Sequence, residues 1–256
     1  MSKSNKKMEN GAKLRLIMIA AVIIVAVVYG SVFYLNHYYH ATQKAQDAMR
    51  GTSVVMVEKE DTYYKFSPDG ETDSGIIFYP GGKVEETAYA PLMEQLAEAG
   101  YEVYLMRMPF RLAVFDMDAA DQVAGKEKTV KRWYLMGHSL GGAMAASYAA
   151  KHTDEFCGLA LLGAYSTADL TDSRLSVLSI YGSEDGVLNR RKYEKYKKNL
   201  PENYTEYVIE GGNHAGYGNY GEQKGDGCAA ISDKEQKQQV VDQVIAKWGG
   251  KNGAGN

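Results

Sequence analysis

The sequence predicts an α/β protein, with a mostly parallel sheet that helices cover on both faces, no large lid, and one transmembrane helix ahead of it. Short apolar runs alternate with amphipathic segments from about residue 75 to residue 248. This rhythm is typical of parallel strands joined by helices. An uncharged apolar run near the N-terminus is long enough to span a bilayer. A chain of 256 residues then holds one globular unit and one appendage.

The N-terminal apolar run extends over Leu16–Leu35 and reads LIMIAAVIIVAVVYGSVFYL. About 20 uncharged residues in a helix span the hydrocarbon core. Basic residues crowd the segment before it, namely Lys3, Lys6, Lys7, Lys13 and Arg15, and such residues favour the cytosolic side. We therefore expect a cytosolic segment over 1–15, a transmembrane helix over 16–36 and an extracytoplasmic remainder, as in a single-pass protein of the cell membrane.

A cleaved signal peptide is the alternative interpretation of this segment, because it also begins with a basic stretch. The apolar run is longer than the core of a usual signal peptide. The residues that follow it, Tyr34–His40, are bulky where a cleavage site needs small side chains. Both features favour a retained anchor.

Beyond the membrane helix we expect a tether over 37–52, a domain over 53–248 and a Gly- and Asn-rich disordered tail over 249–256. The domain opens with two β-prone stretches, Ser53–Lys59 and Tyr63–Ser67. Their spacing predicts a hairpin at the edge of the sheet.

Apolar strands and helical segments then alternate along the domain. The expected strands are Gly75–Tyr79, Glu102–Met106, Arg132–Met136, Gly158–Leu162, Leu175–Tyr181 and Glu206–Glu210. The expected helices are Tyr89–Ala99, Leu112–Val123, Gly141–Lys151, Asn189–Asn199 and Asp233–Trp248. Ligands of such sheets bind outside the carboxyl ends of the strands, so we expect reactive residues in the loops after the strands.

The composition limits the partners of the chain. Its formal net charge is -3, and no basic stripe is present that could neutralise a nucleic-acid backbone. The two cysteines, Cys157 and Cys228, are too few for a disulfide framework and lack the paired spacing of a zinc site. We therefore expect no nucleic acid and no metal. The cysteines fall at opposite ends of the predicted sheet, which predicts two free thiols.

Ser139 is the candidate nucleophile, because it lies in the pattern G-x-S-x-G. The pattern reads GHSLG over 137–141 and stands between a predicted strand and a small-residue helix, the context of a nucleophile elbow. Glycines on both sides leave room for a backbone that turns sharply at the serine. In the alternative interpretation the glycines only let the helix pack closely.

A nucleophilic serine needs an imidazole to accept its proton. His214 lies in a Gly-rich loop after a late strand, GGNHAG over 211–216, and a flexible surface histidine is the alternative interpretation. The triad acid should precede it along the chain. Asp185, in YGSEDG over 181–186, is our choice. Its rivals are Glu184, Asp169 and Asp172.

Two N–H groups are needed to bind the oxyanion that develops during acyl transfer. Leu140, directly after the serine, is the first expected donor. The loop YPGGK over 79–83 follows a strand, and its Gly82, or else its Lys83, is the second.

In this order the motifs resemble those of the α/β-hydrolase superfamily over about Ser53–Trp248. They look most like the small single-domain branch near the dienelactone-hydrolase-like proteins, in bacterial forms with an N-terminal membrane segment. The resemblance rests on YPGGKVE at 79–85, MPF at 108–110, GHSLGG at 137–142, YGSEDG at 181–186 and EGGNHAGYGNYGEQKGDG at 210–227.

The resemblance implies that Ser139, Asp185 and His214 form a triad and that Leu140 and Gly82 bind the oxyanion. The superfamily often begins the oxyanion loop with His-Gly, where this chain has Pro-Gly. The implied function is a membrane-anchored serine hydrolase, carboxylesterase-like, that forms an acyl-enzyme and needs no cofactor. An acyltransferase with the same triad and a noncatalytic membrane-tethered binding module are the alternatives.

Only about nine residues, Ser166–Arg174, stand where larger relatives insert a lid. We therefore expect an open site that accepts a small or surface-held ester, with wall residues at Tyr79, Tyr89 and Tyr217. Two residues of the loop after His214, Gln223 and Asp226, have no role that the sequence assigns beyond ordering that loop.

Overall fold

The protein is described by a computed structural model of residues 3–250, with side-chain surroundings from Gly11 onward. It separates into two compact units, Met1–Tyr38 and Tyr39–Asn256. Residues 251–256 of the predicted disordered tail lie outside the described residues.

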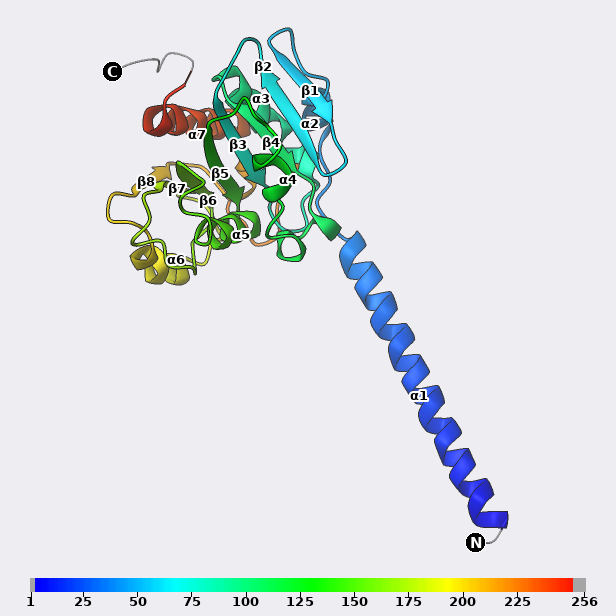
Figure 1. Ribbon diagram of the computed structural model, residues 1–256. Helices are drawn as coiled ribbons and strands as arrows, with labels where there is room; N and C mark the ends of the chain where they lie inside the picture. The colour runs from blue at the N-terminus through cyan, green and yellow to red at the C-terminus, as the bar shows by residue number, and fades with distance from the viewer. Residues whose placement is uncertain (1–2, 251–256) are drawn as a thin grey trace. The chain divides into compact units, whose positions relative to one another are not determined.

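The first unit is one helix, α1 (Lys3–Asn36), drawn in blue in Figure 1. By length and composition its part Gly11–Asn36 can cross a membrane, and its apolar side chains are exposed. A signal sequence shares these properties. The structure thus has the predicted apolar helix, and its retention as an anchor stays a prediction.

The second unit is built on an eight-stranded sheet with the order β1-β2-β4-β3-β5-β6-β7-β8. The strands are β1 (Val55–Lys59), β2 (Tyr63–Pro68), β3 (Ser74–Tyr79), β4 (Glu102–Met106), β5 (Arg132–His138), β6 (Gly158–Leu162), β7 (Ser176–Gly182) and β8 (Thr205–Ile209). Strand β2 runs antiparallel to β1 and β4, and every other pair is parallel. The predicted fold class and the opening hairpin are confirmed.

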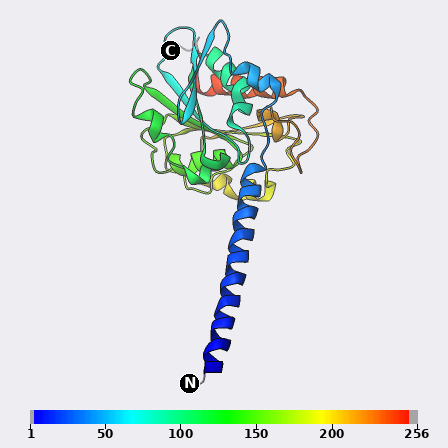
Figure 2. The same ribbon diagram turned by 90° about the vertical axis from the view of Figure 1, so that its right-hand side faces the viewer.

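Helices cover both faces of this sheet because its central strands are apolar on both sides. In β3, Ile76 and Phe78 point into one core, whereas Ile77 and Tyr79 point into the other. The first core is closed by α2 (Gln43–Ala48), α3 (Ala90–Glu98) and α7 (Asp233–Trp248). The second lies under α4 (Asp121–Ala124), α5 (Leu140–Ala149) and α6 (Arg190–Tyr196). Figure 2 shows this layering.

Several elements have the bounds that the sequence predicts, among them β4, β6 and α7. Helix α7 has clear local signals at both ends. The Ser232 side chain accepts a hydrogen bond from the Glu235 N–H, and Gly249 follows the last turn at φ 84°. Serine is a common N-cap residue, and glycine commonly follows the last turn of a helix.

The helix expected over Leu112–Val123 is wrong. The segment forms a 3-10 turn, Ala113–Phe115, and the four-residue α4. The Tyr79 hydroxyl donates to the Met117 carbonyl at 2.7 Å and accepts from the Ala120 N–H at 2.9 Å. A continuous helix would use both of these backbone groups internally. Hydrogen bonds to the buried Tyr79 hydroxyl therefore take the place of two bonds of the expected helix.

The tether expected over 37–52 also differs from the structure. Tyr39 forms a parallel bridge with Val84, and the Thr42 N–H donates to the Asn219 carbonyl at 2.8 Å. Ala41 and Ala45 are buried in the first core. The folded unit thus begins at Tyr39 rather than Ser53, because Ala41, just before α2, and Ala45, within it, are small enough to pack into this core.

This docking predicts that Ala45→Asp lowers the free energy of unfolding by about 3 kcal/mol or more, because it buries a carboxylate in an apolar core. The matched control is Gln46→Asp on the exposed side of α2, with an expected change of about 0.5 kcal/mol. Urea denaturation of the full-length chain in detergent measures both. Equal stability of the two variants would mean that α2 does not belong to the folded unit.

Candidate active site

The residues singled out in the sequence gather at one edge of the sheet. Gly82 follows β3, Ser139 follows β5, Asp185 follows β7 and His214 follows β8. Because these strands are parallel, their carboxyl ends lie at the same edge. This is where ligands bind in sheets of this kind.

Ser139 sits at a sharp turn between β5 and α5, with φ 52° and ψ −122°. The turn requires glycines on both sides. A Cβ on Gly137 would lie 2.6 Å from the Gly142 nitrogen, and one on Gly141 would lie 2.3 Å from the Tyr79 and Pro80 oxygens. The strained angle at a non-glycine residue is the kind found at functional sites, and it leaves the serine half-buried at the edge.

Asp185 and His214 form a buried pair, with 2.8 Å between Asp185 Oδ2 and His214 Nδ1. Their side chains are 0% and 1% exposed. Asp185 Oδ1 accepts from the N–H groups of Val187 and Leu188 at 2.9 and 2.8 Å. When the imidazole is neutral, donation from Nδ1 leaves Nε2 as an acceptor. That Nε2 is buried and has no hydrogen-bond partner among the described residues.

The rival acids do not meet an imidazole at this edge. Glu184 is exposed and accepts from the Ser183 hydroxyl, while Asp169 is exposed and binds Thr171. Asp172 is exposed as well. Of the four carboxylates considered, the structure pairs Asp185 with His214.

Gly163, which we did not single out in the sequence, lies directly against this pair. It follows β6 at φ 53°, and a Cβ there would lie 3.0 Å from both Asp185 Oδ2 and His214 Nδ1. The preceding residue, Leu162, accepts a hydrogen bond from the Ser139 N–H at 2.9 Å. The end of β6 thus contacts both the serine turn and the Asp185–His214 pair. A glycine after a buried strand is the only sequence signal for this position.

The two expected oxyanion donors lie next to each other. A Cβ on Gly82 would be 2.8 Å from Leu140 Cδ2. Leu140 is the first residue of α5, so its N–H has no acceptor within the helix. Within the described chain, the N–H of Gly82 has no hydrogen-bond acceptor, whereas that of Lys83 donates to the Arg111 carbonyl at 2.8 Å. The geometry favours Gly82 over Lys83.

A buried tyrosine holds the same loop. The Gly81 N–H donates to the Tyr89 hydroxyl at 3.0 Å, and this hydroxyl lies 2.7 Å from His138 Nδ1. The His138 ring in turn lies 4.4 Å from the His214 ring. Burial, and secondly the neighbouring His214, lowers the pKa of His138 well below its usual value. His138 is therefore neutral and adds no positive charge beside His214. Because the Tyr89 hydroxyl already accepts from the Gly81 N–H, its own hydrogen is available to His138 Nδ1.

The three tyrosines that we expected to form the walls of the site are fully buried. Tyr79 braces the 117–120 backbone, and Tyr89 binds Gly81 and His138. The Tyr217 hydroxyl donates to the Ile180 carbonyl at 3.3 Å. All three positions differ from the expectation, because these side chains support the loops from beneath instead of facing solvent.

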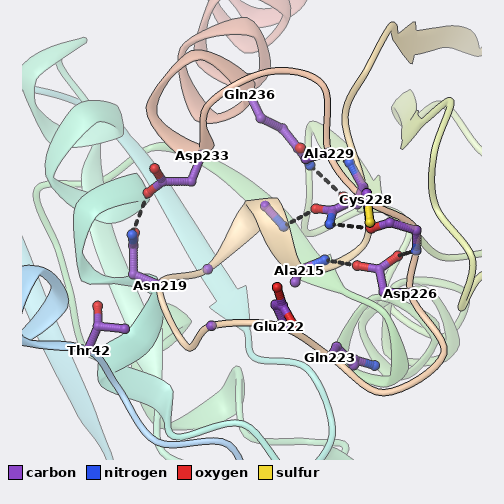
Figure 3. A pocket seen from close by; sticks show the side chains of 15 residues that line it. Thr42, Ala215, Asn219, Glu222, Gln223, Asp226, Cys228, Ala229, Asp233 and Gln236 are labelled. Carbon is purple, nitrogen blue, oxygen red and sulfur yellow. Dashed lines mark hydrogen bonds between the residues drawn. The ribbon is translucent and has the colours of Figure 1, made fainter.

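Asp226 links the acid loop to the histidine loop. Its Oδ1 accepts from the N–H groups of Gly186, His214 and Gly227 at 3.1, 3.1 and 2.9 Å. Its Oδ2 accepts from the Ala215 N–H at 2.8 Å, the contact drawn in Figure 3. One carboxylate thus fixes the residue after Asp185 and the backbone of His214. Its position between two glycines is the sequence signal, because aspartate in such turns binds backbone N–H groups.

The histidine loop is also held from α7 and borders a pocket of about 520 Å³. Gln236 accepts from the Asn213 N–H at 3.0 Å and donates to the Asn213 carbonyl at 2.7 Å. Gln223 lines the pocket, as does Cys228, which like Cys157 is a free, exposed thiol. In the described part of the chain, no group of His, Cys, Asp or Glu residues is placed to hold a metal ion.

Comparison with known proteins agrees with this architecture. Residues 75–238 match the family described as "Alpha/beta hydrolase family". No curated protein matches the chain significantly. Among solved structures, a predicted CIB-like hydrolase from Thermoplasma acidophilum is similar at a TM-score of 0.55 and 16% identity, covering 75% of this chain and 99% of that one. Est1E from Butyrivibrio proteoclasticus is similar at a TM-score of 0.51 and 16% identity, covering 76% of this chain and 99% of that one.

The Asp226 contacts predict that Asp226→Asn slows reaction of Ser139 with a fluorophosphonate about 10- to 100-fold, because the histidine shifts relative to the serine. An asparagine also points a donor at a backbone N–H. Glu222→Gln, at an exposed carboxylate in the same loop, should react at the normal rate. Melting temperatures of the three proteins separate this effect from unfolding. Normal labelling in a folded Asp226→Asn protein would contradict the role of Asp226.

The lowered pKa of His138 predicts loss of stability in acid. Below pH about 6.5 the unfolded chain takes up a proton at this residue and the folded chain does not, so stability falls as the pH falls. His138→Asn keeps an acceptor near the Nδ1 position and removes this titration. Between pH 7.5 and 5.5 the native protein should lose about 1 kcal/mol more than the variant in urea denaturation. Parallel losses would show that the pKa of His138 is the same in the folded and the unfolded chain.

Proposed function

Since the chain belongs to the alpha/beta hydrolase family, we propose that it is a serine hydrolase that cleaves carboxylic esters. The observation that carries the proposal is the buried pair of Asp185 and His214, whose imidazole keeps an unpartnered Nε2. The strained turn at Ser139 supports it, since the adjoining His138 ring packs against the same imidazole.

In the proposed reaction the Ser139 hydroxyl attacks the ester carbonyl while His214 Nε2 accepts its proton. Asp185 keeps the Nδ1–H tautomer and stabilises the imidazolium that forms. The protonated His214 then gives the proton to the leaving alcohol, and the acyl group stays on the serine oxygen. His214 then takes a proton from water, which attacks this acyl-enzyme, and it returns that proton to the serine oxygen as the acid leaves.

The N–H groups of Leu140 and Gly82 are the proposed donors to the tetrahedral oxyanion. Donors fixed before the reaction stabilise this charge more than mobile water does. The Tyr89 hydroxyl supports this arrangement because it holds Gly81, the residue before Gly82. The short loop Ser166–Arg174 is held by Asn199, whose side chain donates to the Ser166 and Thr167 carbonyls, and it leaves the proposed site without a large lid.

We further propose that residues 16–36 anchor the protein as a single transmembrane helix, with residues 1–15 in the cytosol and the hydrolase domain outside. The exposed apolar helix and the basic residues before it support this topology. The proposed place of the chain within its family is the small dienelactone-hydrolase-like branch, on the motifs quoted above.

The proposal predicts fluorophosphonate labelling of the full-length chain and turnover of p-nitrophenyl acetate and butyrate. Ser139→Ala and His214→Ala should each lower kcat by about 10⁴-fold or more, and Asp185→Asn by about 10⁴-fold through loss of the correct tautomer. Ser147→Ala, on the same helix α5, is the control and should react normally.

The outcomes separate the alternatives. Labelling with transfer of the acyl group to an added alcohol, at the expense of hydrolysis, would make the protein an acyltransferase. A folded chain that neither binds the fluorophosphonate nor turns over any ester would be a noncatalytic binding module.

A further inference from the structure

An exposed apolar cluster lies in the segment between β4 and α4. Phe110, Val114 and Phe115 are 57%, 44% and 60% exposed. The rings of Phe110 and Phe115 meet edge to face, with 5.7 Å between their centroids. We call these three residues the 110–115 cluster. Large apolar side chains grouped in solvent mark a binding surface more often than scattered ones do.

The backbone beneath this cluster is strained. Phe110 and Arg111 both have positive φ, at 53° and 59°, and a bulky residue in this region is a genuine outlier. The Arg111 carbonyl accepts from the Lys83 N–H at 2.8 Å, and the Arg111 N–H donates to the Met108 carbonyl at 2.9 Å. The cluster is therefore tied to the loop that carries Gly82.

Apolar side chains connect the cluster to the serine turn. A Cβ on Gly82 would lie 3.5 Å from Leu112 Cδ2 and 2.8 Å from Leu140 Cδ2. Leu140 follows Ser139, and Leu112 stands between Phe110 and Val114 in the chain. Both leucines are half-buried. Two apolar side chains thus lie against Gly82, and one of them, Leu112, belongs to the segment that carries the cluster.

The strand order places this surface on the acyl side of a bound ester. The cluster follows β4 and His214 follows β8, and the two strands lie on opposite sides of β5, which carries Ser139. The leaving alcohol must approach His214 to receive its proton. The acyl substituent then extends the other way, over Gly82 and toward β4.

We infer that the 110–115 cluster, together with Leu112 and Leu140, binds the acyl chain of the substrate, so that the substrate is an ester of an aliphatic acid of several carbons. This inference rests on the proposed function. Complete burial of a methylene group corresponds to about a fourfold gain in kcat/KM. The cluster is exposed and can cover only one side of the acyl chain, so we expect kcat/KM to rise about twofold per methylene.

The test is the chain-length profile of the full-length protein in one nonionic detergent, with p-nitrophenyl acetate, butyrate and hexanoate. The native kcat/KM should rise about 16-fold from acetate to hexanoate, at about twofold per methylene. The variant combines Phe110→Asn with Phe115→Ser, because asparagine tolerates positive φ. It should lose about tenfold on hexanoate and less than about twofold on acetate.

Met56→Ser is the matched control, since Met56 is 58% exposed on the edge strand β1, and it should leave the profile unchanged. A second series keeps the acetyl group and lengthens the alcohol, where we expect a flat profile in every protein.

Three results would overturn the inference while ester turnover persists. The first is a profile that the double variant does not change, as for a surface that contacts only membrane. The second is an equal loss on all esters, and the third is a dependence on the alcohol chain instead. Absence of labelling and of turnover in the native protein would instead reject the proposed function itself.

Discussion

The close approach of α5 to the ends of β3 and β5 is the constraint on which the site depends. Gly141 touches the carbonyl oxygens of Tyr79 and Pro80 so closely that no Cβ fits. This contact sets the start of α5 beside the Gly82 loop and forces the chain through positive φ at Ser139. One backbone contact therefore positions Ser139, the proposed nucleophile, and both proposed oxyanion donors.

Backbone N–H groups stabilise the two carboxylates of the site, Asp185 and Asp226. Asp185 and Asp226 together accept from six of them, and within the described chain neither forms an ion pair with lysine or arginine. Such donors belong to the loops themselves, so each carboxylate fixes the loop that surrounds it. Burial and the neighbouring His214 keep His138 neutral, and its Nδ1 lies 2.7 Å from the Tyr89 hydroxyl. His138 therefore places no positive charge beside His214.

The sequence predicts correctly those strands and helices whose apolar spacing and end residues lie within the element itself. Strand β6 is a continuous apolar run, and α7 has both of its caps in sequence. Ser139, Asp185 and His214 each come shortly after a predicted strand, so the sequence also placed them at the same edge of the sheet. The contacts of Tyr79 with Met117 and of Asp226 with Gly186 join residues about 40 apart. No periodicity encodes such contacts, so the broken helix after Leu112 and the Asp226 bridge were visible only in three dimensions.

Tyr39, the first residue of the folded unit, touches both loops of the site. Its backbone exchanges hydrogen bonds with Lys83 and Glu85, each 2.8 Å long, and its hydroxyl accepts from the Lys224 N–H at 3.1 Å. Its ring packs on Tyr220, with 5.5 Å between centroids. A protease that releases this domain from its helix must therefore cut ahead of Tyr39. A cut a few residues later would remove the residue that contacts both the Gly82 loop and the His214 loop.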